Sequence, residues 1–263
     1  VTEGRRRQTG TSHLCRPRRR GVSGPPDRRR IVSYLNWLLA AAVLRPLRAV
    51  GAEAMALDTQ ETLQLPDPQL KGALSVEAAL QSRRSVRAFA GRALTLADVA
   101  QVLWAAQGIT DAGFGGVRTA PSAGALYPLE VLLLAGEVNG LAPGLYRYRP
   151  HEHALVHLAD GDQRAALAEA ALGQDWIAEA ACVLLLAAVY ARTTAKYGAR
   201  GERYVHVEVG HVGQNIYLQA RALGLGTTMD GAFDDMEVQR LLGLAADESP
   251  LALLPIGRLG QAG

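Results

Sequence analysis

The sequence is poor in residues that cross-link a chain or bind metal. It contains two cysteines in 263 residues, Cys15 and Cys182. So few thiols exclude a disulfide framework and a cysteine-based zinc or iron–sulfur site. Cys182 lies in an apolar run, which is typical of a small buried hydrophobic residue. Hydrophobic residues make up 49% of the chain, and this content excludes a wholly disordered protein.

Lysine is also scarce, since only Lys71 and Lys196 occur. The formal net charge of +3 averages two unlike parts. Residues 1–54 hold twelve arginines and three acidic residues, a net charge of +9, whereas residues 55–263 have a net charge of −6. The basic isoelectric point therefore comes from the first part, and it does not indicate that the whole chain binds nucleic acid.

The sequence has no hydrophobic run long enough for a comfortable membrane span, which needs about 20 residues. Its apolar segment at residues 31–44 follows Arg28, Arg29 and Arg30 and is of a length typical of an export signal. Ala52-Glu53-Ala54 supplies a small-x-small cleavage pattern. This order resembles a twin-arginine (Tat) signal, which predicts a periplasmic protein without a stable membrane anchor.

The alternative is that translation starts at Met55, the first methionine, which would give a cytoplasmic protein. With either start, we expect three segments. Residues 1–54 form a disordered basic leader and residues 55–74 an extended arm, because its prolines oppose a helix. Residues 75–263 form one domain.

The pattern of the domain mixes helices and strands. Buried strands are expected at 129–135, 145–149, 154–158, 181–190 and 251–256, and helices at 75–83, 95–108, 162–172, 203–223 and 235–242. Residues 109–124 are expected to form a glycine-rich loop. The elements do not alternate regularly as βαβ units, which favours an α+β layered domain over a doubly wound one.

Three short segments could carry chemistry. Arg83, Arg84, Ser85 and Arg87 lie within five residues, and guanidinium forks with a hydroxyl suit a phosphomonoester. A solvated basic turn is the alternative for such a run alone. Residues 120–128 contain prolines and Gly124, which fix a bent backbone that a flat ligand can approach. Residues 226–234 are similarly rich in small side chains, including Gly231 and Ala232.

Together these segments resemble the nitroreductase-fold flavoproteins, and specifically their SagB-type dehydrogenase (azoline oxidase) branch. The resemblance covers residues 75–258. It is carried by seven short motifs in order, at residues 83–87, 120–128, 196–204, 208–215, 224–226, 231–235 and 255–258. It implies an α+β fold with a central, mainly antiparallel sheet flanked by helices, and a homodimer with FMN at the subunit interface.

The resemblance also implies roles for individual residues. Arg83, Ser85 and the adjacent Arg84 would hold the FMN phosphate, and Arg258 would be a second phosphate contact. Arg87 would reach the N1/O2 edge of the flavin, where a cation favours the negative charge that gathers on reduction. The remaining contacts are Pro121, Ser122, Ala123 and Gly124 from the partner chain, and a backbone N–H of Gly231 or Ala232 facing N5.

Lys196 and Tyr197 are the candidate catalytic residues. In a chain that otherwise uses arginine, a lysine beside a tyrosine is notable because lysine can act as a base and arginine cannot. In azoline oxidases a Lys–Tyr pair at this place is the proposed proton-transfer unit, and the resemblance implies the same here. A surface lysine beside a packed tyrosine is the alternative. His206 and His211 diverge on a helix, so no metal site is predicted.

The sequence therefore predicts an FMN-dependent oxidoreductase that transfers hydride through flavin N5, with an azoline-like ring or another small molecule as the C–H donor. One alternative is an NAD(P)H-dependent nitro or quinone reductase. The other is a flavin-binding protein without catalysis.

Overall fold

The computed structural model describes residues 61–113 and 116–260. The predicted leader, its apolar segment at 31–44 and the first residues of the arm lie outside the described residues. In the part that is described, no helix has both the length and the apolar character needed to cross a membrane.

A seven-stranded sheet forms the centre of the domain, and all of its neighbouring strands are antiparallel. This confirms the predicted α+β class with an antiparallel sheet. In spatial order the strands are β1 (Thr62–Gln64), β8 (Ala154–Asp160), β7 (Gly144–Arg149), β5 (Leu129–Ala135), β9 (Cys182–Ala188), β11 (Ser249–Arg258) and β10 (Leu225–Thr227).

The central strands are buried on both faces because their side chains alternate between two hydrophobic clusters. In β9, Leu184 and Leu186 belong to one cluster, whereas Val183 and Leu185 belong to the other. All seven residues of β9 are buried. A strand that is buried on both faces has a nearly continuous apolar sequence. For this reason the sequence predicts β5 and β9 with nearly correct bounds.

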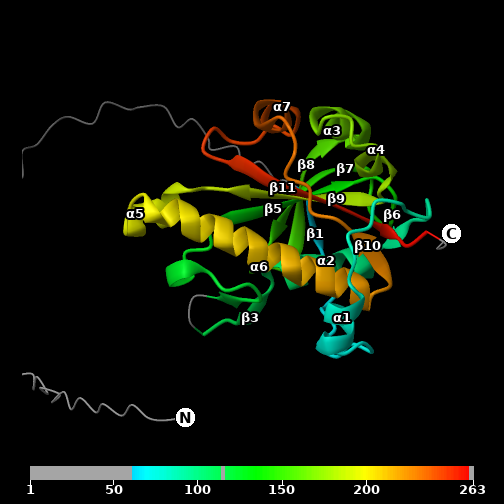
Figure 1. Cartoon of the computed structure of the whole chain (residues 1–263), viewed down its shortest axis with the longest axis horizontal. Helices are drawn as coiled ribbons and strands as arrows, with labels where there is room; N and C mark the ends of the chain where they lie inside the picture. The colour runs from blue at the N-terminus through cyan, green and yellow to red at the C-terminus, as the bar shows by residue number, and fades with distance from the viewer. Residues whose placement is uncertain (1–60, 114–115, 261–263) are drawn as a thin grey trace, which may run out of the picture. The chain divides into compact units, whose positions relative to one another are not determined.

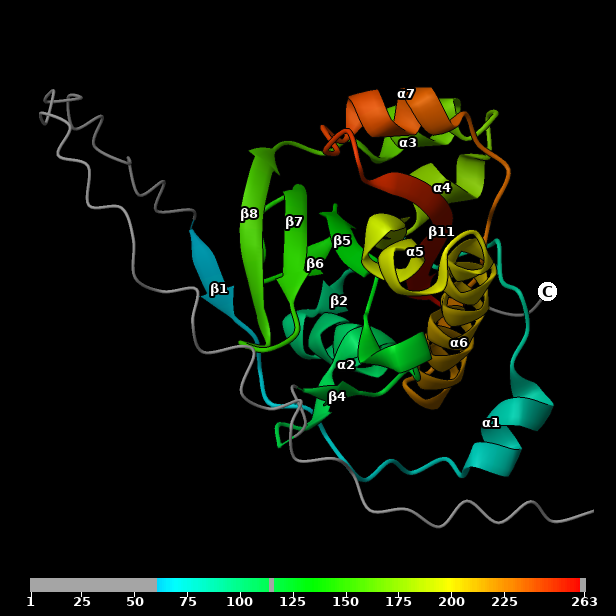
Figure 2. The same ribbon diagram turned by 90° about the vertical axis from the view of Figure 1, so that its left-hand side faces the viewer.

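Helices cover each face of the sheet (Figures 1 and 2). One face packs against α2 (Leu96–Gln107) and α6 (Arg200–Ala222), and the other carries α3 (Arg164–Ala170), α4 (Asp175–Glu179) and α7 (Asp235–Leu241). Two short helices contact α6 at its opposite ends: α5 (Ala191–Tyr197) near the first turns and α1 (Val76–Ser82) near the last ones.

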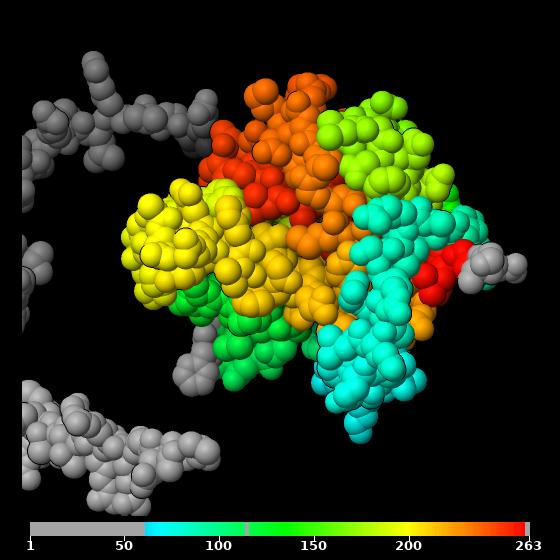
Figure 3. Space-filling model, viewed as in Figure 1, coloured from blue at the N-terminus to red at the C-terminus, as the bar shows by residue number. Residues whose placement is uncertain are grey.

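Helix α6 has 23 residues and buries one stripe against the sheet. The buried residues of that stripe include Val205, Val209, Val212, Ile216 and Ala220, as the sequence pattern predicts. The other side of the helix is exposed and crosses the surface between α5 and α1 in the space-filling view (Figure 3).

Side-chain caps mark the starts of two helices. The Thr95 hydroxyl accepts a hydrogen bond from the Asp98 N–H, and the Asp98 carboxylate accepts one from the Thr95 N–H, which forms a capping box. Helix α2 ends at Gln107, before Gly108. At α1, the Ser75 hydroxyl accepts from the Ala78 N–H.

The structure contains elements that the sequence analysis did not place, among them the short helix α4. The expected loop at 109–124 contains a hairpin of β3 (Ile109–Asp111) and β4 (Val117–Arg118), followed by a 3₁₀ turn at Ala123–Ala125. Two further strands, β2 (Leu94–Thr95) and β6 (Val138–Asn139), pair in parallel. Helix α5 buries only Thr193, so its sequence carries no apolar period from which it could be predicted.

Leu184 tests the two-sided core, because its side chain is 1% exposed in the most buried strand. We expect Leu184→Ala to lower the free energy of unfolding by about 2–5 kcal/mol, through lost burial and an unfilled cavity. Met236→Ala is the control, since Met236 is 77% exposed on α7 and should change stability by less than about 0.5 kcal/mol. Urea unfolding measures both. Equal losses in the two variants would contradict this account of the core.

Candidate functional site

A cationic pocket lies between the end of α1 and the last turns of α6. Its volume is about 190 Å³, and its lining includes Arg83, Arg84, Tyr217 and Arg221. No carboxylate lines it, and none of its three guanidinium groups has an ion-pair partner within residues 61–113 and 116–260. Three unpaired guanidinium groups around one cavity are suited to a dianion such as a phosphate monoester.

Tyr217 connects the arginine-rich segment to the helix. Its hydroxyl lies 3.1 Å from the Ser85 hydroxyl and accepts a hydrogen bond of 2.8 Å from the Met229 N–H. The guanidinium of Arg83 lies 5.4 Å from the centre of the Tyr217 ring. Arg221 donates from Nε to the Ser82 hydroxyl at 2.8 Å. These contacts fix the orientation of the side chains that surround the pocket.

The sequence did not single out Arg221 or Tyr217, although both line the pocket. Arg258, in contrast, does not line it. Its guanidinium pairs with the Asp98 carboxylate at 2.6 Å, so the capping box of α2 also binds the end of β11. Tyr217 and Arg221 are four residues apart on α6, so the sequence could have suggested them as neighbours. Only the packing of α1 against α6 makes them part of a site.

Arg87 lies at a separate position from this pocket. One of its guanidinium nitrogens is 4.0 Å from Asp230, and the guanidinium lies 5.3 Å from the centre of the Trp176 ring. Asp230 is buried and accepts a hydrogen bond of 2.9 Å from the Trp176 indole N–H. The half-exposed guanidinium is thus held between a carboxylate and an aromatic face, beside the segment that contains Gly231 and Ala232.

The turn after β4 has an unusual backbone conformation. Gly124, Ala125 and Tyr127 all have positive φ angles, of 67°, 53° and 45°. Positive φ is unfavourable for residues with a side chain, so surrounding contacts must hold such a turn. The Ser122 hydroxyl accepts a hydrogen bond of 3.0 Å from the Tyr127 N–H, and the Ser122 carbonyl accepts one of 3.1 Å from the Ala125 N–H.

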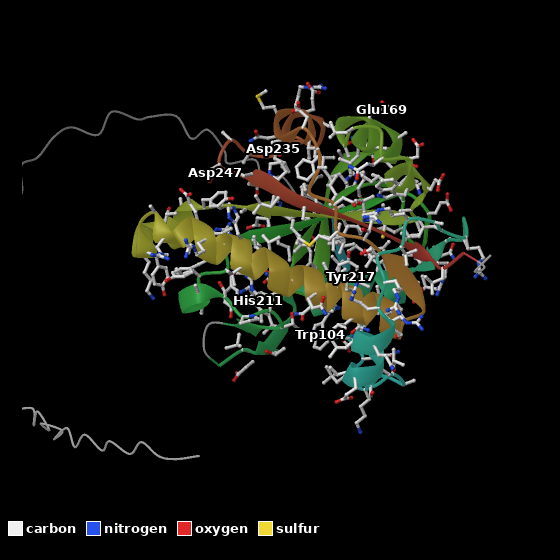
Figure 4. All side chains as sticks on the ribbon, viewed as in Figure 1. Trp104, Glu169, His211, Tyr217, Asp235 and Asp247 are labelled. Carbon is white, nitrogen blue, oxygen red and sulfur yellow. The ribbon has the colours of Figure 1, made fainter. Side chains whose placement is uncertain are left out.

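Polar side chains of α6 hold the segment that leads into this turn. Asn215 donates to the Thr119 carbonyl at 3.3 Å, and His211 Nδ1 lies 3.3 Å from the Pro121 carbonyl. Figure 4 labels His211 and Tyr217, with His211 nearer to α5 and Tyr217 nearer to α1 along the helix. The exposed and half-buried polar residues of α6 therefore position the segment that contains Pro121 and Ser122.

Glu208 is the buried acid of this helix. Its side chain is 2% exposed and accepts a hydrogen bond of 3.4 Å from Gln107, whose carbonyl oxygen accepts one of 3.0 Å from Arg118. Burial raises the pKa of the Glu208 carboxyl above its usual value, and hydrogen bonds from Ser122 and Gln107 and the charge of Arg118 oppose the shift only in part.

Lys196 and Tyr197 form the last turn of α5 and face the 3₁₀ turn. A Cβ atom added to Gly124 would lie 2.7 Å from Tyr197 Oη and 2.9 Å from Lys196 Nζ. The Lys196 ammonium is 5.4 Å from the centre of the Tyr197 ring, and that ring contacts the Tyr204 ring edge-to-face. Among the described residues, neither Nζ nor Oη has a hydrogen-bond or ion-pair partner. The pair is therefore free to exchange a proton with a bound molecule.

Two other groups considered from the sequence have ordinary environments. His206 Nε2 lies 2.6 Å from the Tyr190 hydroxyl, and in the described part of the chain no three His, Cys, Asp or Glu side chains gather as metal ligands. Cys182 is fully buried in β9, and burial raises its pKa to about 12, which leaves it unreactive.

Glu208 gives a test of this polar core. Because its folded pKa is raised, the folded protein binds this proton more tightly than the unfolded chain does, and stability falls as pH rises from the unfolded pKa through the folded one. Glu208→Gln removes that loss. We expect the Tm of the variant, relative to wild type, to increase as the pH rises above about 4.3, the unfolded pKa of glutamate.

Glu169→Gln is the matched control, because Glu169 is exposed on α3 and its replacement should give no such trend. Differential scanning fluorimetry across pH measures all three proteins. A Glu208→Gln difference that is constant or falls with pH would contradict the assignment of the buried proton.

Comparisons with known proteins agree with the fold. The sequence profile described as "Nitroreductase family" matches residues 80–258. A curated protein of Methanocaldococcus jannaschii, named "Putative nitroreductase MJ1384", is 48% identical over 201 residues, which are 76% of this chain and 98% of that protein.

Two solved structures are similar in fold. A "putative nitroreductase" from Anabaena variabilis has a TM-score of 0.67 at 29% identity, over 76% of this chain and 42% of that one, so this chain spans less than half of the Anabaena protein. The E. coli microcin synthetase McbBCD complex has a TM-score of 0.59 at 24% identity, over 82% and 85% of the two chains. Since the family profile matches most of this chain and a relative is 48% identical over 98% of that relative's length, the chain belongs to the nitroreductase family of oxidoreductases.

Proposed function

We propose that this protein is a homodimeric, FMN-dependent oxidoreductase of the SagB type that removes hydrogen from an azoline-like ring or a similar small C–H donor. The observation that carries the proposal is the position of Lys196 Nζ and Tyr197 Oη, side by side at Gly124 and without other polar partners among the described residues. Two proton-exchanging groups with free polar ends suit a reaction that must remove a proton from carbon.

The residues of the cationic pocket fit the phosphate end of FMN. Arg83, Arg84 and Arg221 offer guanidinium groups that have no ion-pair partner among the described residues, around a cavity without carboxylates in its lining, and such donors suit a phosphate monoester. Arg87 would hold the polar edge of the flavin ring, with Asp230 and Trp176 fixing its guanidinium. FMN, when bound, supplies the acceptor for a hydride; the protein supplies positions and charges.

The distance along α6 supports a homodimer. Tyr204, which contacts the Tyr197 ring, and Arg221 are 17 residues apart on this helix, or about 25 Å at 1.5 Å per residue. An FMN molecule is shorter than that. A flavin whose phosphate lies against Arg221 would therefore use the turn and the Lys–Tyr pair of a second copy of the chain.

The chemical step proposed for this chain is a proton transfer. As two electrons and one hydrogen leave the substrate carbon as hydride, a proton leaves the adjacent atom of the ring and is taken up at Lys196 Nζ or Tyr197 Oη. Lys196 is exposed, so its side chain can then release the proton to solvent. Oxygen, a quinone or a nitro compound would then accept the electrons.

A second candidate is an NAD(P)H-dependent nitro or quinone reductase. It is favoured by the names of the relatives, since both the 48% identical protein and the Anabaena structure are described as nitroreductases. In that reaction NAD(P)H provides the hydride, so no proton needs to leave a carbon atom and the Lys–Tyr pair would have no essential role.

Arg221 tests the phosphate pocket. We expect Arg221→Ala to weaken FMN binding by about 10- to 100-fold, the loss that follows when a charge-assisted hydrogen bond is removed. The measurement is equilibrium dialysis of the apoprotein against FMN. Arg240→Ala is the control, because Arg240 lies on exposed α7 and pairs with Glu237, and it should bind FMN like wild type. Equal affinity of both variants would contradict the pocket assignment.

The Lys–Tyr pair distinguishes the two reactions. We expect Lys196→Ala and Tyr197→Phe to reduce oxidation of azoline model compounds by about 100-fold or more, as expected for a lost general base, while FMN content stays normal. Anaerobic bleaching of the bound flavin by the azoline measures the step. Rapid NADH- or NADPH-dependent reduction of a nitroarene that survives both substitutions, without any azoline oxidation in wild type, would favour the reductase instead.

A further inference from the structure

We propose that Gly124 is a positioning residue for the Lys–Tyr pair: its missing side chain leaves the space in which Lys196 Nζ and Tyr197 Oη lie. This inference rests on the proposed role of that pair in proton transfer. The positioning role of Gly124 is separate from any contact that the turn makes with FMN.

The geometry leaves no room for a methyl group. A Cβ on Gly124 would be 2.7 Å from Tyr197 Oη, 2.9 Å from Lys196 Nζ and 3.5 Å from Tyr197 Cε2. The first two distances are well inside van der Waals contact, so the atoms would have to move apart. The two crowded atoms are the same two that exchange the proton in the proposed reaction.

The turn itself cannot easily relieve the crowding. Four hydrogen bonds hold it: Ser122 accepts from the N–H groups of Ala125 and Tyr127, the Arg118 N–H donates to the Tyr127 hydroxyl at 3.2 Å, and Arg192 donates to the Tyr127 carbonyl at 3.2 Å. The guanidinium of Arg118 also lies 4.4 Å from the centre of the Tyr127 ring. These contacts maintain three positive φ angles in four residues.

The ends of the Lys196 and Tyr197 side chains are, in contrast, easy to displace. Lys196 is exposed, Tyr197 is half-buried, and neither polar end is held by a hydrogen bond to a described residue. An alanine at 124 would thus move Nζ and Oη and leave the fold intact. A displacement of about 1 Å in a reacting group can reduce a rate by as much as about 100-fold.

Lys71 can serve as an internal reference when the displacement of Lys196 is measured, because these two are the only lysines of the chain. The experiment treats the full-length, FMN-loaded protein with sulfosuccinimidyl acetate and follows acetylation of each lysine by peptide mass spectrometry. The ratio of the Lys196 rate to the Lys71 rate reports the environment of Nζ and requires no turnover. The variants are Gly124→Ala and, as a matched control, Gly243→Ala.

Gly243 is suitable because it also has a positive φ, of 58° against 67° for Gly124, while an added Cβ there would meet nothing within 4 Å. It therefore reproduces the backbone strain without the crowding. We expect Gly124→Ala to raise the Lys196-to-Lys71 ratio by about two- to fivefold, the equivalent of losing an exposed contact between the ammonium and the Tyr197 ring. Gly243→Ala should leave the ratio unchanged, and both variants should show similar losses in Tm.

An unchanged ratio in Gly124→Ala, or the same change in Gly243→Ala, would overturn the inference. If Gly124→Ala does not yield folded protein, the triple variant Gly124→Ala/Lys196→Ala/Tyr197→Ala replaces it. If the triple variant folds, the result supports crowding between the alanine at 124 and the Lys–Tyr pair. If neither variant folds, the inference is overturned, because backbone strain alone then explains the failure to fold.

The rate of azoline oxidation separates this inference from the proposed function. A raised labelling ratio together with an approximately 100-fold lower rate supports both. A raised ratio in a protein whose wild type never oxidises azolines supports the contact at Gly124 and contradicts the proposed reaction. In an active protein, Gly124→Ala added to the double variant Lys196→Ala/Tyr197→Phe should lower the rate no further, because both groups on which Gly124 acts are already removed.

Discussion

The packing of α6 against the central sheet is the interaction on which the rest of the structure depends. Five apolar residues of this helix are buried on one stripe, against strands whose own side chains are buried on both faces. The three valines and Ile216 each contribute about 1.5–3 kcal/mol of burial relative to exposure, and this burial fixes both the helix and its orientation. The polar residues of α6 take their positions from that arrangement.

The opposite sides of α6 therefore have different roles. Its buried stripe stabilises the domain, whereas its polar residues hold the surface segments that could bind a ligand. Near one end, Tyr217 and Arg221 meet the arginines that follow α1; farther back, Asn215, His211 and Glu208 hold the segment before the strained turn. A long rigid helix is well suited to this purpose because its side chains keep fixed spacings over many residues.

Strain and unpaired charge are concentrated where the proposed chemistry would occur. Three positive φ angles occur within the turn at 124–127, and the free ends of Lys196 and Tyr197 lie directly against it. The arginines of the cationic pocket likewise have no acidic partners among the described residues, although several acidic residues of the domain pair with arginine elsewhere, as Asp98 does with Arg258. Such costs are tolerated in a folded protein when the surrounding core is stable enough to bear them.

The sequence by itself determined the class of the fold and most of its elements. The apolar runs of β5 and β9, the capping box at Thr95 and the stripe of α6 are local patterns, and local patterns survive in the folded state because they follow from backbone geometry. The motifs likewise named the arginine segment and the Lys–Tyr pair. Tertiary structure alone decided which of these residues meet. It places Tyr217 and Arg221 beside Arg83, and it pairs Arg258 with Asp98. It also places the ends of the Lys196 and Tyr197 side chains against Gly124. These partners lie between about 70 and 160 positions apart in the chain, and no local period encodes contacts over such separations, which depend on how whole helices and strands pack.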